Sequence, residues 1–425
     1  MPRVLIIGAG PVGLLTALRL GQAGIKIDVL EKEPSLSEEP RAIGYYSSAL
    51  IPLLRAGVLE DLVKIGFEGK GLCWRKPLVD DGKGGKKLGD TIAWLPVPTK
   101  TDQPHGVDGT LYLPQSEMNK LLFRRVLETG NVNVHFNTRL TSIEQKEDEV
   151  RVMAETLDPK IKRVEFRADF LVGADGGRST TRKILDIRMK GHSWPEYIVA
   201  TDFYFQMDDV DPDFPTSLIV HPIHYGLLTP INQFKKGERT LYRCSVGLDP
   251  SETRSPEELT SESFVNSLLE QMLPGPRPLQ FKVKKSSAYR THQLCASTFR
   301  RGRCILAGDA AHLNHPWGAM GLTTGLIDSE AAADALEIIL LEGKSPDILD
   351  IYAQERQRAF QFFVSPYSTQ NKLRVLNRPE NARDDWLLGK LSQPVGVDAV
   401  LRDYGQPYQD KWRTDIRKLI EEAAL

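Results

Sequence analysis

Three glycines near the start of the chain have the spacing of a turn that binds a dinucleotide. Residues 8–13 read GAGPVG and lie between a short β-branched run and a segment with helical periodicity. Gly8 permits a tight turn, Gly10 lets the backbone approach a pyrophosphate, and Gly13 allows close packing of helix on strand. Glu31 stands 23 positions after Gly8 and can accept hydrogen bonds from ribose hydroxyls. This pattern predicts dinucleotide binding rather than an ordinary turn, and it leaves FAD and NAD both open.

A second candidate site lies late in the chain, where residues 308–312 read GDAAH directly after an apolar run. Asp309 would stand at the carboxyl end of a strand, where it can accept hydrogen bonds from a polyol such as the ribityl chain of a flavin. A helix is expected to begin at Gly321, Leu322 and Thr323, and its dipole would stabilise negative charge on a reduced flavin. The alternative is a glycine-rich loop that only caps a helix.

A third turn follows another apolar run, at residues 175–182, which read DGGRSTTR. Taken singly, the segment is more typical of a turn that leads into an N-capped helix. Its interpretation as part of a site depends on the other two motifs.

Each of these turns needs a strand before it and a helix after it, and the sequence indicates both. The first 31 residues have the order strand, helix, strand, which is a complete βαβ unit. Helices are also expected at 47–63, 115–129, 262–272 and 321–341. Strand-type alternation is found at 197–205, 218–220, 225–229 and 241–246. The predicted fold class is therefore α/β, with a Rossmann-like cofactor domain, a mainly β substrate domain and a C-terminal helical segment.

Charge and cysteine usage exclude several other classes of protein. The chain has 55 basic and 56 acidic residues and a net charge of -1, which gives no electrostatic reason to expect nucleic acid or an anionic membrane as partner. No apolar run approaches the ~20 residues needed to span a bilayer. The four cysteines show neither CxxC pairing nor metal-ligand spacing, so we expect reduced thiols, no metal site and a cytoplasmic protein.

Together the three motifs resemble those of the class A flavoprotein monooxygenases, the para-hydroxybenzoate hydroxylase-like family that also contains phenol and salicylate hydroxylases. That family has an N-terminal GxGxxG, a middle DG and a late GD in the same order and at roughly these separations. The resemblance runs from Met1 to about Glu355. It implies a discontinuous FAD-binding domain, a substrate-binding β domain and a C-terminal helical region, and the expected bounds are 1–73, 106–190 and 289–355 for the first, 74–105 and 191–288 for the second, and 356–425 for the third.

The resemblance also implies roles for the residues of the glycine-rich turns. Gly8, Gly10, Gly13 and Glu31 would hold the ADP half of FAD, and Asp309 would bind the ribityl chain.

Further positions match family residues outside the first glycine turn. Arg41 corresponds to an arginine that contacts the cofactor beside the mobile flavin, and Gln115 to a glutamine near FAD. Asp175 and Gly176 match the pair associated with FAD and with the passing NAD(P)H. Pro316 matches the proline close to the reaction centre.

One segment departs from the family pattern. Where the family has Gly-Leu-Asn-Thr-Gly, residues 321–325 read GLTTG. Thr323 still offers a backbone N–H but lacks the asparagine amide.

The activity implied by the resemblance is a monooxygenase reaction. NAD(P)H would dock transiently, reduce FAD and leave, and O2 would then form a C4a-hydroperoxyflavin whose distal oxygen is transferred to an electron-rich carbon. The product would be a hydroxylated or epoxidised small aromatic or conjugated compound. A simple phenol and a polyketide-like molecule of secondary metabolism both fit, as do a monomer and a homodimer.

Polar residues of the expected β domain are candidates for contact with such a substrate. Those with suitable chemistry are His221, His224, Tyr225, Tyr204, Arg243 and Tyr289. We take Pro316, His224, Tyr225 and Arg243 as the catalytic set, because a base that deprotonates a phenol makes its ring more nucleophilic. Trp317, beside Pro316, is expected to be a stacking wall or a structural aromatic residue.

Two other functions use the same scaffold. A flavin-dependent halogenase would need a WxWxIP motif, and residues 92–96 read IAWLP instead. A non-catalytic flavin-bound ligand sensor is the alternative from a different class.

Overall fold

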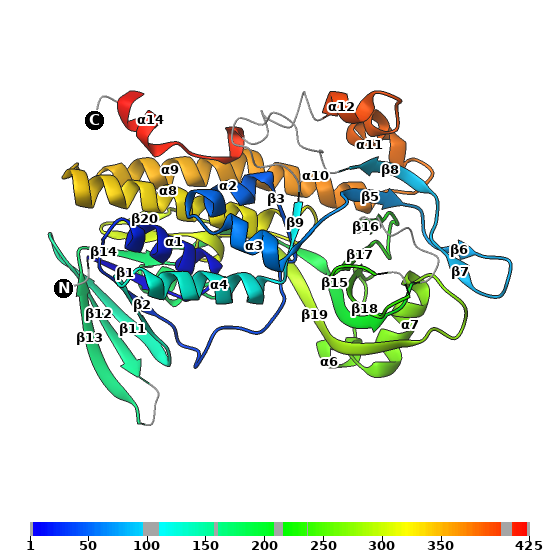
Figure 1. Ribbon diagram of the computed structural model, residues 1–425, viewed down its shortest axis with the longest axis horizontal. Helices are drawn as coiled ribbons and strands as arrows, with labels where there is room; N and C mark the ends of the chain where they lie inside the picture. Colours follow the sequence, from blue (N-terminus) through cyan, green and yellow to red (C-terminus); the bar gives the residue numbers. More distant parts are fainter. Residues whose placement is uncertain are drawn as a thin grey trace.

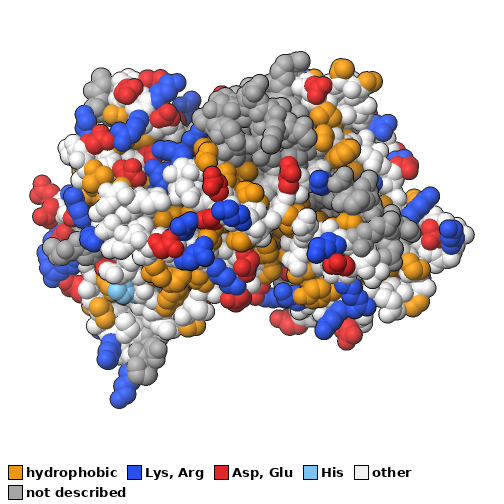
Figure 2. All heavy atoms as spheres, in the orientation of Figure 1, with side chains coloured by type: hydrophobic (Ala, Val, Ile, Leu, Met, Phe, Trp, Pro, Cys, Tyr) orange, Lys and Arg blue, Asp and Glu red, His pale blue; other side chains and the backbone are white. Residues whose placement is uncertain are grey.

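The fold consists of two large sheets that lie at opposite ends of the molecule, joined by long helices along one edge (Figure 1). A computed structural model of the protein describes residues 3–96, 110–156, 160–207, 216–235, 237–400 and 410–422. Figure 2 shows acidic and basic side chains interspersed on the visible face, as expected for a chain with a net charge of -1.

The first sheet is the predicted Rossmann-like layer. Its six strands are β10 (Val132–His135), β2 (Ile27–Leu30), β1 (Val4–Ile7), β14 (Phe170–Gly173), β21 (Cys304–Leu306) and β20 (Arg300–Arg301), in that order. The first five are parallel, and only β20 runs antiparallel. Helix α1 (Pro11–Gln22) contacts both α4 (Gln115–Glu128) and α8 (Met320–Glu342). Strands β1, β2 and β14 are fully buried, as parallel strands covered on both faces should be.

The second sheet is the predicted substrate layer. Its eight strands are β22 (His312–Leu313), β19 (Phe281–Ala296), β15 (Met189–Phe205), β18 (Thr240–Gly247), β17 (Gly226–Pro230), β16 (Thr216–Ile219), β5 (Leu72–Arg75) and β8 (Thr91–Leu95), in that order. One face packs against α7 (Glu262–Met272) and α6 (Pro256–Leu259). The other face packs against Trp317 and α11 (Trp386–Leu391).

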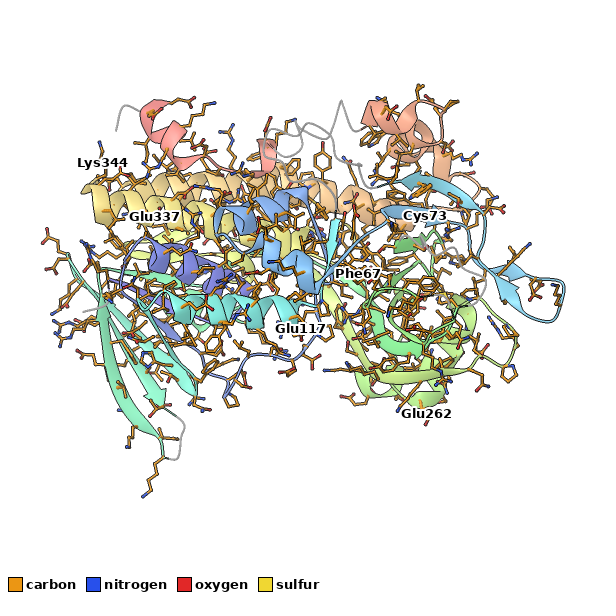
Figure 3. The ribbon with its side chains drawn as sticks, viewed as in Figure 1. Phe67, Cys73, Glu117, Glu262, Glu337 and Lys344 are labelled. Atoms are coloured by element: carbon orange, nitrogen blue, oxygen red, sulfur yellow. The ribbon has the colours of Figure 1, made fainter. Side chains whose placement is uncertain are left out.

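Smaller elements complete the chain. The short strands are β3 (Gly44–Tyr46), β9 (Thr110–Tyr112), β4 (Phe67–Glu68), the hairpin β6 (Val79–Asp80) and β7 (Lys86–Lys87), and the sheet of β11 (Thr138–Gln145), β12 (Val150–Thr156) and β13 (Lys162–Ala168). The remaining helices and turns are α2 (Ser47–Arg55), α3 (Leu59–Ile65), α5 (Thr180–Ile184), η1 (Gly308–Ala310), α9 (Ile348–Ala359), the π-helical turn η2 (Phe360–Val364), α10 (Ser365–Val375), η3 (Ala382–Asp384), α12 (Gly396–Val400) and α14 (Ile416–Glu422). Phe67 and Cys73, both labelled in Figure 3, lie on β4 and β5, and all four cysteines are free and buried.

The structure differs from the sequence-based expectations in two ways. The helix predicted at 47–63 is wrong, because Gly57 adopts a φ of 68° and separates α2 from α3. Strands β15 and β19 are much longer than expected, because their polar halves pair with each other rather than ending in loops. The domain edges predicted at 73, 190 and 288 lie within β5, β15 and β19, and the edge predicted at 105 lies outside the described residues; the division into domains stays a prediction.

A buried charge cluster ties the C-terminal segment to the first sheet. Asp328 on α8 accepts hydrogen bonds from the Gly308 backbone N–H (2.9 Å) and Arg356 Nε (2.7 Å), and its Oδ2 lies 2.6 Å from His312 Nε2. Burial raises the pKa of Asp328, but His312 and Arg356 outweigh that effect and hold it below its ordinary value. Arg356 Nη1 also donates to the carbonyl of Trp412, at 2.6 Å.

Replacing Arg356 with methionine should therefore destabilise the whole chain. The Arg356 and Asp328 side chains are 0% exposed, so Arg356→Met would leave a buried carboxylate without its cation, at a cost of about 3–5 kcal/mol. The free energy of unfolding in urea measures this loss. Arg417→Met, which breaks an exposed pair with Glu342 in the same segment, should cost less than about 1 kcal/mol. Equal costs for the two variants would contradict the assignment.

Candidate functional site

The three predicted turns meet at one edge of the first sheet. β14 pairs with β1 on one side and with β21 on the other, and all three are parallel. Their carboxyl ends are therefore neighbours, and the turns that follow them begin at Gly8, Ala174 and Ala307. Ligands of open parallel sheets bind at such an edge.

The first turn is shaped by the close approach of backbone to backbone. Gly8 has a φ of 105°, and a Cβ there would lie 2.5 Å from the carbonyl oxygen of Ala174. A Cβ on Gly13 would lie 2.0 Å from the carbonyl oxygen of Gly8. By contrast, a Cβ on Gly10 would meet no atom within 4 Å. Gly8 and Gly13 are thus required by the fold itself, while Gly10 faces the open space that a pyrophosphate would fill.

Glu31 is oriented by this same turn. Its Oε2 accepts the Ala9 backbone N–H at 2.7 Å, and its Oε1 accepts that of Glu33 at 3.0 Å. Each oxygen keeps a second lone pair, so the carboxylate can still accept ribose hydroxyls at the start of α1.

The Asp175 carboxylate is engaged by the start of the helix that follows it. It accepts hydrogen bonds from the backbone N–H groups of Thr180 (2.7 Å) and Thr181 (2.9 Å) and from the Ser179 hydroxyl (2.5 Å). The two N–H groups are the first of α5, so the carboxylate caps a helix, as in the alternative interpretation of the turn. Gly176 has a φ of 78°, in the left-handed region that favours glycine.

Asp309 is the acidic group that stays accessible. Its side chain is exposed, yet surrounding protein raises its pKa by desolvation, while His312 and Arg41 oppose that shift. A carboxylate that solvent can reach but that protein surrounds lies in a recess. A group that binds a ribityl chain is expected in such a place. Tyr289 is 39% exposed and also has its pKa raised by desolvation, so it lines a recess in the same way.

Helix α8 begins beside this recess. Ala319 precedes it with a φ of 53°, and no side chain caps its first turn, which contains no acidic residue. The Thr323 hydroxyl donates back to the carbonyl of Ala319 at 3.0 Å, so it does not replace the asparagine amide of the family pattern. The helix dipole at Gly321 and Leu322 is thus left available for an anionic ring.

The segment around Arg41 is fixed by hydrogen bonds to the backbone carbonyls of residues 40–42. The Gln115 backbone N–H donates to the carbonyls of Pro40 (2.8 Å) and Ala42 (2.9 Å), and Arg243 Nη1 donates to that of Arg41. Arg41 itself has a φ of 40°, a backbone conformation that is costly for a residue other than glycine. This bracing holds Arg41 close enough to Asp309 to oppose part of the rise that burial causes in the pKa of that carboxyl.

The predicted catalytic set is not gathered in one place. Arg243 forms a two-pronged ion pair with Asp202 (2.7 and 2.9 Å), which occupies it as a brace rather than as a free catalyst. Tyr225 is buried, and its hydroxyl donates to Glu196 at 2.7 Å.

His224 lies in the turn that joins β16 to β17. It is exposed and shares a surface hollow with Ile219 and Met272, two residues of the core on the α7 side of the sheet. Its neighbour Tyr225 packs against Trp317 on the other side, and the catalytic role of His224 stays a prediction.

The structure contains a buried ion pair near the Pro316 loop that the sequence analysis did not predict. Lys372 Nζ contacts Glu196 Oε1, and the two side chains are 0% and 6% exposed. Burial lowers the pKa of Lys372 to about 7, and the Glu196 carboxylate in contact with it favours the charged form. The partners are 176 positions apart, and no local pattern connects them.

The chain is similar to several known proteins. Residues 1–365 match the family described as FAD binding domain. The chain is 34% identical over 430 residues to para-nitrophenol 4-monooxygenase of Pseudomonas sp. (strain WBC-3), covering 99% of this chain and 97% of that protein. It is 31% identical to 6-hydroxy-3-succinoylpyridine 3-monooxygenase of Pseudomonas putida, with 94% and 95% covered.

Solved structures agree with these sequence similarities. A p-nitrophenol 4-monooxygenase from Pseudomonas putida superposes with a TM-score of 0.81 at 30% identity, covering 96% of this chain and 98% of that chain. Aklavinone-11 hydroxylase in complex with FAD and aklavinone gives 0.73 at 25%, with 90% and 70% covered. These relatives are monooxygenases and hydroxylases rather than halogenases or sensors.

The described ranges contain neither a candidate metal site nor a candidate membrane-spanning helix. No group of three or more His, Cys, Asp or Glu side chains there is arranged to hold a metal ion. None of the helices described has the length and apolarity needed to cross a bilayer.

Gly10→Ala and Gly13→Ala should separate cofactor binding from folding. The new Cβ at position 13 overlaps a carbonyl, so ligand-free Gly13→Ala should lose about 1–3 kcal/mol of stability. Gly10→Ala should unfold like wild type without FAD but bind FAD about tenfold more weakly, or ~1.4 kcal/mol. Thermal unfolding and an FAD fluorescence titration measure the two effects. Unchanged FAD affinity in Gly10→Ala would show that this backbone does not approach the pyrophosphate.

His315 should make the protein sensitive to acid. Burial lowers the pKa of His315 to about 4, from an ordinary value of about 6.5. Between these values the unfolded chain binds a proton that the folded chain does not, so stability should fall as the pH falls from about 6.5 to about 4, by up to about 3 kcal/mol. Urea unfolding at several pH values should show a flatter profile for His315→Phe. The exposed His224→Asn is the control, and it should keep the wild-type slope.

Proposed function

The chain belongs to the FAD-binding-domain family of flavin-dependent aromatic monooxygenases, and on that premise we propose that it hydroxylates a small phenol with a substituent para to the hydroxyl group. The similarity to para-nitrophenol 4-monooxygenase carries this proposal, because it covers 97% of that protein. A second relative with nearly full coverage is named for a hydroxypyridine, again a six-membered ring that carries a hydroxyl group. These names favour a small ring over a polyketide-like substrate.

The residues around the recess have separate roles in this proposal. Gly10 and the start of α1 receive the pyrophosphate of FAD, Glu31 accepts the ribose hydroxyls, and Asp309 accepts those of the ribityl chain. The N-terminus of α8 faces the pyrimidine edge of the flavin ring. When bound, FAD supplies the redox chemistry between NAD(P)H and O2.

The remaining site residues act on position and access. Arg41 stands beside the flavin with its backbone braced by Gln115 and Arg243. Pro316 faces the substrate, and Tyr289 forms part of the wall. Asp175 contributes through the backbone of its turn, since its carboxylate caps α5. The buried, unpaired cysteines support a place in the reducing cytoplasm.

p-Nitrophenol is the substrate that tests this proposal. Oxygen insertion at its C4 carbon must expel the nitro group, because that carbon bears no hydrogen. One p-nitrophenol, one O2, one NAD(P)H and one proton would give benzoquinone, nitrous acid, water and NAD(P)+. We expect p-nitrophenol to raise NAD(P)H oxidation about tenfold or more, with one nitrite released for each substrate consumed.

The measurements are absorbance at the NAD(P)H band, a nitrite assay and product mass. Phenol without the nitro group is the control, and it should release no nitrite. NAD(P)H oxidation that no para-substituted phenol stimulates would contradict the proposal.

A further inference from the structure

In the loop that carries Pro316, the residue on each side of the proline packs against an aromatic ring. On one side, the ring of His315 lies edge-on against Trp194, with centroids 5.9 Å apart. On the other side, the ring of Trp317 packs against Tyr225, with centroids 4.8 Å apart. Pro316 itself is half-buried between these two neighbours, which are 1% and 2% exposed.

One buried ion pair fixes both of the supporting rings. Lys372 Nζ stands 3.6 Å from the centroid of the Trp194 ring, which is the geometry of a cation–π interaction. Its partner, Glu196, accepts the Tyr225 hydroxyl at 2.7 Å on the same oxygen that contacts Lys372. The pair is therefore connected to His315 through Trp194 and to Trp317 through Tyr225.

The helix that carries Lys372 also touches the loop directly. Asn314 Nδ2 donates to the Ser368 hydroxyl on α10. A Cβ on Gly318 would lie 2.3 Å from Asn371 Nδ2, so α10 and the loop are in close contact. Gln293 accepts the Trp194 Nε1–H at 3.2 Å and donates to the Ser365 carbonyl at 2.7 Å, which ties Trp194 to the same helix.

We propose that the Lys372–Glu196 ion pair is the positioning element of the Pro316 loop, which sets where Pro316 stands relative to the bound substrate. The inference rests on the proposed function, because Pro316 is assigned there to the substrate side. Neither charged group touches substrate, so both are positioning residues. A loop that shifts would leave the substrate badly placed, and NAD(P)H and O2 would then be converted, with one proton, into NAD(P)+ and hydrogen peroxide.

The test uses the full-length, FAD-loaded enzyme and three variants. Lys372→Met and Glu196→Gln each remove one charge of the pair, and the double variant Lys372→Met/Glu196→Gln removes both. We expect each single variant to lower the coupling ratio, the product formed for each NAD(P)H oxidised, by about threefold or more. Hydrogen peroxide should rise by the amount of product lost.

Stability and coupling should separate in the double variant. A single variant leaves an unpaired buried charge, so its unfolding temperature should drop sharply, whereas the double variant should recover much of that loss. Its coupling ratio should stay low, because Trp194 still lacks the cation that holds it. In the ligand-free protein, near-ultraviolet circular dichroism should show looser tryptophan packing in all variants that lack Lys372. Coupling that recovers together with stability would overturn the proposal.

A matched control lies on the same helix. Arg374 pairs with Asp385 at 2.7 Å, and their side chains are 2% and 17% exposed. Arg374 also donates to Asn371 at 2.6 Å, and a change at Asp385 leaves that bond in place. Asp385→Asn removes this charge and keeps a residue that can cap α11. It should lose stability and keep wild-type coupling. Equal uncoupling in this control would assign the effect to α10 as a whole and overturn the role of the pair.

Failure of the proposed function would look different. In that case wild type itself would release no product with any para-substituted phenol, and none of the variants could be compared. A wild-type enzyme that hydroxylates with high coupling, and single variants that do so equally well, would contradict the positioning role alone.

Discussion

The site depends on one constraint, which is that backbone must approach backbone where three parallel strands end. Val12 of α1 is the point of contact, because a Cβ on either Gly308 or Gly325 would lie 2.8 Å from its side chain. Helices α1 and α8 can therefore both close on the turn before Asp309. This packing brings the N-termini of two helices to the same edge of the sheet, and helix N-termini are places that can receive anionic groups.

Acidic residues that follow strands of the first sheet look alike in sequence but do three different jobs. Glu31 is oriented by two backbone N–H groups, Asp175 caps a helix N-terminus, and Asp309 is left accessible in its recess. Asp175 differs from Glu31 because two hydroxyl groups, those of Ser179 and Thr181, donate to it in addition to two backbone N–H groups. Only a carboxylate with spare acceptor capacity can serve a cofactor.

The glycine turns at the end of the first sheet could be predicted from sequence because their constraints are local. Gly8 and Gly13 stand where no side chain fits, and Asp309 follows a buried strand directly, so short motifs record them. The substrate side could not be predicted in this way. His224 lies in a turn between two strands of the distant second sheet, and Lys372 meets Glu196 only after the whole chain has folded. Composition and periodicity carry no record of such long-range pairings.

The π-helical turn η2 sets how the two buried cations on either side of it are oriented. Helices α9 and α10 continue through it as one rod, with Arg356 on one side of it and Lys372 on the other. In an unbroken α-helix these two positions would differ by about 160° around the axis. Each residue of the wider π turn rotates the chain by a smaller angle than an α-helical residue does. Both cations therefore come closer to one side of the rod. A single deletion within 360–364 would swing one of the two cations away from its carboxylate partner.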